Sequence, residues 1–402
     1  MPGWPEKLGR AALIGAAMAL AGCNPLVRPS LGPYQPLLRD PPARAAGAPQ
    51  IWFLGSSTLV LRDGATTIMI DGFFSRPRLP RMVLRPRSVR KRVDGGLALG
   101  GFRREAPDAA ALFVAHSHHD HALDSSVVAN RLGAILIGSP SSLSLALGDD
   151  PPAKRICLAG DRDQFEFGPF TVTVFETPHS EGALRTILGE VTKPPPRRRS
   201  LSDYKALTSH AYHIEHRDGL RERRILIVPS ANYALGSFVT PQHPNGVPAD
   251  VVFLAVAKLN ALEPGEAEEY WRRSVTATRA KLVIPIHWDD IMRPLEKKGR
   301  PRDFKTIPYA QDDFHAAMRI IMPLALRDGV ELRLPRRAGP VDIEARTGPG
   351  PTREIEQSRN LLSDVPLSEG AWAKALPFPL GPKLERGPST SSHPPRLKKC
   401  PA

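Results

Sequence analysis

A six-residue stretch that begins at His116, with the sequence His-Ser-His-His-Asp-His, has the residue types and spacing of a metal site. It directly follows an apolar run that predicts a buried strand, and catalytic groups often lie on loops at strand ends. Because side chains two apart on an extended segment point to the same side, His116 and His118 can share one ion. Asp120 and His121 come where the chain turns into a helix and can face a second ion. Imidazole and carboxylate suit zinc and other borderline divalent ions.

A histidine-rich turn that arose by chance is the alternative for this stretch. The chain has only 12 histidines in 402 residues, so chance seldom places three of them and an aspartate at these four positions. We therefore favour a metal site. His119 lies inside the stretch at a position that does not fit the ligand pattern, and we expect it to be solvated or to support a ligand from behind.

The pattern H-x-H-x-D-H after a strand resembles the signature of the metallo-β-lactamase superfamily. The segment Thr177-Pro178-His179-Ser180 follows another predicted strand and is similar to the family's third histidine ligand of the first metal. The segment Ile284-Pro285-Ile286-His287-Trp288 is similar to its late histidine ligand of the second metal. The resemblance covers roughly residues 49–335. It implies an α/β fold, an αββα sandwich of two mixed β-sheets flanked by helices.

The resemblance implies two divalent metal ions, with Zn2+ as the first choice and Mn2+ or Fe2+ as alternatives. Each ion would be held by three protein ligands from the segments just described. The first set is His116, His118 and His179, and the second set is Asp120, His121 and His287. Two further segments, 52–55 and 71–74, resemble the lactonase and phospholipase-D-like branch of the superfamily.

The chemistry implied by this ligand set is hydrolysis. A metal-bound water has its pKa lowered towards neutrality, and the resulting hydroxide would attack a carbonyl or phosphoryl centre. We assign catalytic roles to Asp120, His116 and His118, and Asp120 can also orient the nucleophile or accept its proton. The bond that is cleaved belongs to an ester, lactone, amide or phosphodiester, and the sequence does not choose among them.

One departure from the family pattern concerns an aspartate that bridges both metals in many members. Ser230 stands at the matching place. One subclass of metallo-β-lactamases has serine there and still binds two zinc ions, so we expect a weaker second site. Asn232 and Tyr233 lie just beyond and could reach substrate or belong to a polar loop. Lys258 ends a predicted strand and could hold a substrate carboxylate or phosphate, although an ordinary surface lysine is the simpler interpretation.

The elements that must position these residues are predicted by short apolar or alternating segments. Strands are expected at 51–54, 58–62, 67–70, 111–115, 135–137, 170–175, 211–215, 225–228, 251–256 and 282–286, and helices at 123–131 and 265–280. Early strands come in hairpins and later ones alternate with helices, which suits a mixed-sheet sandwich. His210, His213 and His216 lie on or beside one strand, and a spacing of three does not put them on one face. We interpret these three as structural or exposed.

The N-terminus has the features of a bacterial lipoprotein signal. Lys7 and Arg10 precede an apolar run of signal-peptide length that is too short for a comfortable membrane-spanning helix. The run ends in Leu20-Ala21-Gly22-Cys23, which resembles a lipobox and implies acylation of Cys23. Asn24 after the cysteine favours the outer membrane. The alternative is a plain signal peptide or a buried helix with a chance cysteine.

Differences in composition along the sequence predict four segments. We expect a signal peptide over 1–22, a tether over 23–48, the metallo-β-lactamase-type domain over 49–338 and a Pro-rich tail without a packed core over 339–402. The three cysteines, Cys23, Cys157 and Cys400, show no metal-ligand spacing, and their sparsity argues against a disulfide scaffold.

The positive charge of the chain bears on which substrates and surfaces it can bind. The formal net charge is +14, and residues 76–92 contain eight basic residues and no acid. This segment is either a solvated loop or a contact with anionic lipid or substrate. We expect a small-molecule or lipid-derived substrate, a periplasm-facing location in the cell envelope, and an anionic membrane surface as a candidate partner. That location argues against nucleic acid as the substrate.

A competing hypothesis from another class is a metal-binding envelope scaffold without turnover. Structural zinc sites are usually closed by four protein ligands, which the predicted sites do not supply. The sequence contains no G-x-S-x-G elbow and no G-x-G-x-x-G or Walker loop, which argues against a serine hydrolase and against a nucleotide enzyme. The sequence leaves the substrate, the native metal and the oligomeric state open.

Overall fold

The structure is a computed structural model that describes residues 27–39, 49–64, 66–77, 110–180, 187–195, 200–219, 221–298, 300–309, 311–337, 339–366 and 395–400. The predicted signal peptide with Cys23 lies outside the described residues. So do residues 78–92, which make up most of the basic segment.

The first sheet contains six strands in the order β2-β3-β4-β5-β6-β7. Antiparallel pairing joins β2, β3 and β4, and parallel pairing joins β4 through β7. The strands are β2 (Gln50–Gly55), β3 (Thr58–Asp63), β4 (Thr66–Ile70), β5 (Ala111–Val114), β6 (Ile135–Gly138) and β7 (Ile156–Leu158). The β3–β4 hairpin turns at Gly64, whose φ of 52° a glycine adopts without strain.

The second sheet contains eight strands in the order β16-β13-β12-β11-β10-β9-β8-β18. Its centre, β8 to β11, is antiparallel, and β11, β12, β13 and β16 run parallel. The strands are β8 (Asp163–Phe167), β9 (Phe170–Pro178), β10 (Thr208–Asp218), β11 (Arg221–Val228), β12 (Val251–Ala255), β13 (Leu282–Ile286), β16 (Glu331–Leu332) and β18 (Arg396–Leu397). Two small sheets pair β1 (Leu38–Arg39) with β17 (Leu334–Pro335), and β14 (Glu296–Lys297) with β15 (Arg300–Pro301).

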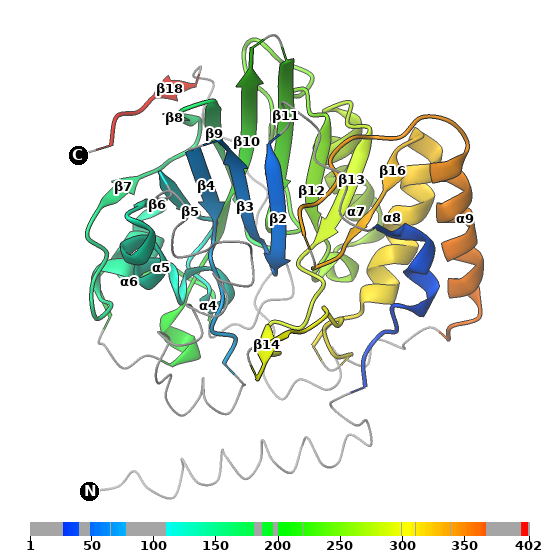
Figure 1. The fold of residues 1–402 in the computed structure, drawn as a ribbon, viewed down its shortest axis with the longest axis horizontal. Coiled ribbons are helices and arrows are strands. Elements are labelled where there is room, and N and C mark those ends of the chain that lie inside the picture. The colour runs from blue at the N-terminus through cyan, green and yellow to red at the C-terminus, as the bar shows by residue number, and fades with distance from the viewer. Residues whose placement is uncertain are drawn as a thin grey trace, which may run out of the picture.

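Helices cover the outer faces of both sheets (Figure 1). The first sheet carries α4 (His119–Ala122), α5 (Ser125–Leu132) and α6 (Pro140–Leu147). The second carries α7 (Pro264–Trp271), continued by the π-helical turn η5 (Arg272–Thr276), then α8 (Phe314–Asp328) and α9 (Gly350–Ser363). Short 3-10 turns are η1 (Gly32–Leu37), η3 (Leu201–Asp203) and η4 (Leu259–Ala261). The predicted αββα sandwich of two mixed sheets is therefore confirmed.

The core lies between the two sheets, where aromatic rings of facing strands interlock. The ring of Phe113 on β5 lies 5.4 Å from that of Tyr212 on β10 and 5.7 Å from that of Phe165 on β8. All three side chains are 1% exposed or less. Burying aromatic surface on this scale stabilises the sandwich and fixes the two sheets relative to each other. The loops at the ends of β5, β9 and β13 are therefore anchored to strands whose relative positions are fixed.

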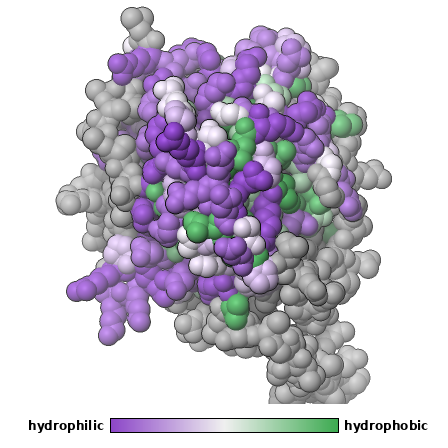
Figure 2. Space-filling view, turned by 90° about the vertical axis from the view of Figure 1, so that its right-hand side faces the viewer, coloured by the Kyte–Doolittle hydropathy of each residue, from purple (hydrophilic) through white to green (hydrophobic). Residues whose placement is uncertain are grey.

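The outer face that carries α8 and α9 is largely hydrophilic where it is coloured in Figure 2, with small, separate apolar spots. Such scattered spots are normal for a solvent-facing surface. Within the described ranges, no helix has the length and apolar character needed to cross a membrane.

The predicted tether over 23–48 is wrong for residues 31–39, which pack onto the domain. Tyr34 in η1 is fully buried and its hydroxyl lies 2.7 Å from Nδ1 of His315. Leu37 is 1% exposed, and β1 continues the chain along β17. Two well-placed apolar side chains are enough to dock a segment whose overall composition is that of a linker.

The predicted tail without a packed core is wrong for residues 341–366. The backbone N–H of Val341 donates to the carbonyl of Ile51, and α9 then packs against α8 and η1. Ile355 and Leu362 in α9 are 1% and 2% exposed. Their spacing of seven puts both on one helix face, which is a helical signal inside a polar and Pro-rich region.

A disulfide joins Cys157 of β7 to Cys400 near the C-terminus. Next to it, β18 pairs in parallel with β8 and forms the edge of the second sheet. The two cysteines are separated by 243 residues, so no local spacing pattern predicts the pair. The bond fastens the last described residues to the domain.

Candidate metal centre

Three strands end at the rim of the sandwich and deliver the predicted ligands. His116 and His118 follow β5, His179 follows β9, and His287 follows β13. Asp120 and His121 come from α4, which begins one residue after His118. The structure therefore brings together all six predicted metal ligands, in the two groups of three that the sequence predicted.

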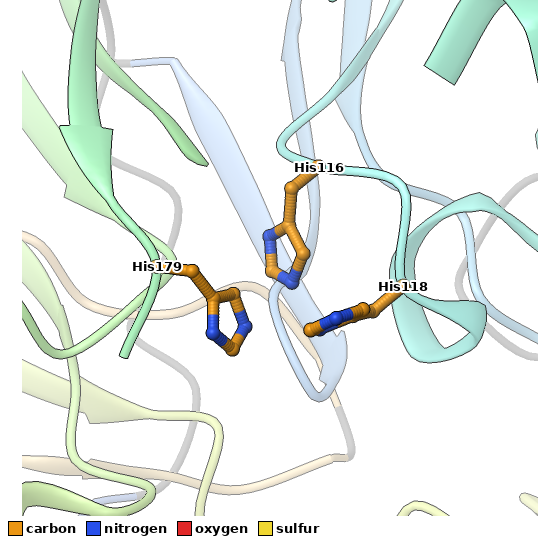
Figure 3. A group of neighbouring side chains, drawn as sticks. All are labelled: His116, His118 and His179. Atoms are coloured by element: carbon orange, nitrogen blue, oxygen red, sulfur yellow. The ribbon is translucent and has the colours of Figure 1, made fainter. Parts of the chain in front are cut away.

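The rings of His116, His118 and His179 converge on one point (Figure 3). Their ring centroids lie 4.3–4.9 Å apart. One ring nitrogen from each lies within 4.8 Å of the others. The side chains are also buried, at 2%, 4% and 7% exposed, so water screens the group little.

Each of the three rings uses one nitrogen to contact a protein oxygen. Nδ1 of His116 lies 3.2 Å from Oγ of Ser209, Nε2 of His118 lies 3.0 Å from the Ile187 carbonyl, and Nδ1 of His179 lies 2.9 Å from the Ser180 carbonyl. Such contacts are typical of metal-binding histidines, because they fix the ring and its tautomer. The nitrogens left to face the centre are Nε2 of His116, Nδ1 of His118 and Nε2 of His179. Nε2 of His116 is buried without a hydrogen-bond partner.

The protonation state of this group suits a metal. Burial, followed by the neighbouring histidines, lowers the pKa of His116 and of His179 well below its usual range. Burial also lowers the pKa of His118 to about 4, although Asp120 opposes the shift. Neutral imidazole is the form that binds a metal ion.

The second group is equally compact. Nε2 of His287 lies 3.2 Å from Nε2 of His121 and 3.1 Å from Oδ2 of Asp120. Two ligand atoms about 2.0–2.1 Å from one tetrahedral ion are about 3.3 Å apart, so these separations fit a shared divalent ion. Burial acts to raise the pKa of Asp120, but His121, His119 and His287 hold it well below its usual range. Asp120 therefore stays ionised, which is the form that can bind a metal ion.

Backbone geometry also places His287. Its φ is 59°, in the left-handed region that non-glycine residues seldom adopt. Its N–H donates to the carbonyl of Ser56 at 2.8 Å. Such backbone conformations persist where the surrounding structure enforces them and are common at functional sites.

Asp71, directly after β4, supports the second group from behind. Its Oδ2 lies 2.7 Å from Nδ1 of His121 and accepts a hydrogen bond from Ser57, while its Oδ1 accepts from the N–H of Ala115 at 2.8 Å. The carboxylate thus fixes the His121 tautomer that leaves Nε2 free for the ion. In the sequence, Asp71 stands out only as part of a family-like segment, and no local pattern points to Ser57 or Ser209. An Asp-Gly directly after a buried strand was the available signal for Asp71.

Ser230 and Asn232 hold the His179 loop. Oγ of Ser230 accepts the N–H of Ser180 at 2.7 Å, and the Asn232 amide donates to the His179 carbonyl at 2.9 Å. Asn232 is fully buried. Both side chains therefore position a ligand loop, and neither belongs to the two ligand groups.

Lys258 is not an ordinary surface lysine. Its backbone is left-handed, with a φ of 63°, and its N–H donates to Asp312 at 2.9 Å. Its ammonium group donates to the Gln311 carbonyl. Burial lowers its pKa, and Asp312 opposes that shift. The lysine ties the end of β12 to the segment before α8.

The remaining predicted histidines lie apart from the ligand groups. His213 lies 2.8 Å from the Pro248 carbonyl and His216 lies 2.9 Å from Asp63, both through Nε2, which confirms their structural role. His210 is buried on the same strand, and its backbone N–H donates to the carbonyl of Ala115. His119 is 9% exposed, contacts the Phe73 ring edge-on and belongs to neither ligand group.

Comparison with known proteins adds context to this geometry. No protein-family model and no curated protein matches the chain. Among solved structures it is similar to the Rm3 metallo-beta-lactamase, at 18% identity and a TM-score of 0.34, over 83% of this chain and 97% of that one. It is also similar to Igni18, a metallo hydrolase from Ignicoccus hospitalis, at 11% identity and a TM-score of 0.42, over 73% and 97% of the two chains. Because these TM-scores are below 0.5, the fold is assigned from the sheet order, and the candidate metal centre from the geometry of its side chains.

Proposed function

We propose that this protein is a hydrolase that depends on two divalent metal ions, with Zn2+ as the first choice. The observation that carries the proposal is the convergence of six ligand side chains in two buried groups at one rim of the sandwich. Each group offers three protein ligands. That number is typical of catalytic zinc, which keeps a position open, whereas structural zinc is usually closed by four protein ligands.

Ions bound in these groups would lower the pKa of water and polarise the bond to be cleaved. The chain's own residues would organise the rest. Oδ2 of Asp120 faces His287, whereas Oδ1 lies 3.6 Å from Nδ1 of His119. Because Asp120 is ionised, Oδ1 can hold the proton released by an attacking water. Asp71, Ser209 and the Ile187 carbonyl keep the ligand rings in place while this happens.

The substrate class that we propose is an ester, lactone, amide or phosphodiester of a small or lipid-derived molecule. A lipid-derived substrate is supported by the lipobox-like segment at Cys23, because an acylated chain works at a membrane surface. The basic segment 76–92 supports an anionic surface as a partner. Arg76, the first residue of the segment, does not contribute to binding such a surface, because it is 1% exposed and forms an ion pair with Asp289.

We also propose a location in the bacterial cell envelope, facing the periplasm, with the outer membrane favoured. The disulfide between Cys157 and Cys400 supports it, because such bonds persist in oxidising compartments. With those two cysteines paired, Cys23 is the one cysteine left for acylation.

The catalytic proposal is tested by removing metal, reloading it and following hydrolysis of generic ester, lactone, amide and phosphodiester substrates. We expect activity on at least one class that is lost without metal and restored by zinc. His118→Ala should abolish it. The matched control is His243→Ala, a half-buried histidine outside both ligand groups, which should keep it. A zinc-loaded chain inactive on all four classes would favour the scaffold hypothesis.

The anchoring proposal is tested with Cys23→Ser. We expect this variant to move from the membrane fraction to the soluble envelope fraction, because two acyl chains are needed for stable anchoring. A variant that stays on the membrane after a high-salt wash would exclude lipidation as the anchor.

A further inference from the structure

Arg337, two residues after β17 ends, is a buried arginine without a counter-ion. Its side chain is only 7% exposed, and none of its three guanidinium nitrogens has a hydrogen-bond partner. Its guanidinium carbon lies 5.6 Å from the ring centroid of Phe304. A ring face attracts the charge but accepts no directional hydrogen bonds comparable to those of a carboxylate. Burying an unpaired charge is costly, so a group in this state is suited to an anion from outside the chain.

A small cavity that opens to solvent lies next to Phe304. Phe304 is common to both, since its ring contacts Arg337 and also lines the cavity. The charged side chains that line it come from the segment after β4, from the loop between β13 and β14, and from the segment after β15. They are Arg76, Asp289, Asp290, Arg293, Arg302, Asp303 and Lys305.

The two buried carboxylates of the lining are already occupied. Oδ2 of Asp289 accepts from Arg76 at 2.6 Å, and its Oδ1 accepts from the N–H of Ser56 at 2.6 Å. Oδ2 of Asp290 accepts from Arg28 at 2.8 Å, and its Oδ1 accepts from the N–H of Met292 at 2.9 Å. Neither is left to neutralise a further cation.

Positive charge is therefore left over. Nε of the half-buried Arg293 is buried without a partner. Arg302 and Lys305 also line the cavity, and their side chains form no ion pair with a described residue. Against Arg293, Arg302, Lys305 and Arg337, the neighbourhood offers the exposed carboxylate of Asp303 and the half-buried one of Glu296. The excess is about two positive charges, which matches a phosphate dianion.

Burial and neighbouring arginines lower the pKa of both Arg337 and Arg293. Burial and then Arg76 lower the pKa of Arg337 to about 10, although three carboxylates oppose the shift. Burial, Arg302 and Arg28 likewise lower the pKa of Arg293. Guanidinium groups normally stay charged far above neutral pH. A bound anion would offset the cost of burying these charges and the repulsion from the neighbouring arginines.

We propose that Arg337 and Arg293, with Arg302 and Lys305 at the mouth, form a binding site for a phosphoryl oxyanion, separate from the two ligand groups. Guanidinium forks match the paired oxygens of a phosphate, which favours this anion over a halide. The phosphoryl group belongs either to a phospholipid headgroup or to a free phosphate ion. The site lies behind the His287 loop, because Asp289 and Asp290 of that loop form part of its wall.

The test measures binding of inorganic phosphate to the zinc-loaded full chain by calorimetry, together with the thermal midpoint in phosphate and in chloride of equal ionic strength. We expect phosphate to raise the midpoint of the wild type by several degrees. Arg337→Met should weaken the phosphate affinity at least tenfold, and in chloride it should be as stable as the wild type or more so. Arg293→Gln is a second variant, expected to weaken phosphate binding in the same direction. Phosphate that binds at the metal ions would remain in both variants, so the difference isolates this site.

The matched control is Arg217→Met, which removes an arginine whose side chain is 66% exposed on β10. It should keep the full response to phosphate. An equal response in wild type, Arg337→Met and Arg293→Gln would overturn the proposal. Loss of stability in chloride on removing Arg337 would also overturn it, because the guanidinium would then have a partner within the chain.

The source of the phosphoryl group is resolved with vesicles and the Cys23→Ser chain, which lacks the proposed anchor. If the ligand is a headgroup, phosphatidylglycerol vesicles should bind this chain more tightly than phosphatidylcholine vesicles, and adding Arg337→Met should remove the difference. If the ligand is free phosphate, Arg337→Met should change phosphate binding and leave vesicle binding unchanged. A change in neither would contradict the site.

Discussion

The hydrogen bond between Asp71 and His121 gives a sharp test of how the second metal group is held. In Asp71→Asn, one carboxylate oxygen becomes an NH2 group of nearly the same shape. The amide oxygen can still accept the N–H of Ala115, which now donates to Oδ1 at 2.8 Å. The NH2 group, however, would face Nδ1 of His121 at the present 2.7 Å.

Two donors cannot share that contact, so His121 must move its proton from Nδ1 to Nε2. Nε2 is the nitrogen that faces His287 and would bind the ion. Loss of such a supporting contact typically weakens metal affinity by about 10–100-fold, or about 1.4–2.7 kcal/mol. The Ser57 hydroxyl can turn and accept from the new amide, so it does not add to this loss. We expect the effect only at the second site, because Asp71 contacts no ligand of the first.

The assay is chelator competition with zinc, read as the affinity and number of ions per chain, with circular dichroism as a check of folding. The matched control is Asp63→Asn, because Asp63 contacts the buried His216 at 2.9 Å in the same way but away from the metal groups. Asp71→Asn should lose one ion at a chelator concentration at which Asp63→Asn keeps two. If a folded Asp71→Asn binds both ions as tightly as the control, the orienting role assigned to Asp71 is wrong.

Three further predictions concern stability and the ligand loops. Asn232→Ala should lower the free energy of unfolding by about 1–3 kcal/mol, measured by urea denaturation, because the buried His179 carbonyl loses its donor. Asp124→Asn should stabilise the protein increasingly as the pH rises from about 4 to above 6. Burial raises the pKa of Asp124 from 3.8 to about 6. The free energy of unfolding of the wild type therefore falls by up to about 3 kcal/mol through that pH range, whereas that of the variant does not. Parallel curves of stability against pH for the two proteins would contradict this. Ile355→Ala should cost about 2–4 kcal/mol because the side chain is 1% exposed in α9, whereas no change in thermal midpoint would mean that α9 is not docked.

The sequence predicted the strands around the site because their signals are local. The hairpin at Asp63-Gly64 appears as β3 and β4, and the apolar run 111–115 appears as β5. The helix expected over 265–280 was only partly right, since α7 ends at Trp271 and a π-helical turn follows. The ligand set was predictable for the same reason, because each histidine or aspartate directly follows a recognisable strand or belongs to one dense motif.

Contacts between distant segments were not predictable in this way. Ser209 faces His116 across 93 residues, and the Cys157–Cys400 bond spans 243. Neither partner carries a local pattern that names the other. The segments 31–39 and 341–366 were misjudged because average composition hid a few apolar side chains that dock on the domain. Arg337 gave no signal at all, since burial of an arginine depends wholly on tertiary packing.

The central claim is that the chain holds two divalent ions through two groups of three ligands. Metal content per chain, measured after dialysis against a weak chelator, tests it most directly. We expect about two ions in the wild type and about one in both His118→Ala and His287→Ala, each with the fold intact. A folded wild type that retains no divalent metal, with neither variant different from it, would contradict the claim.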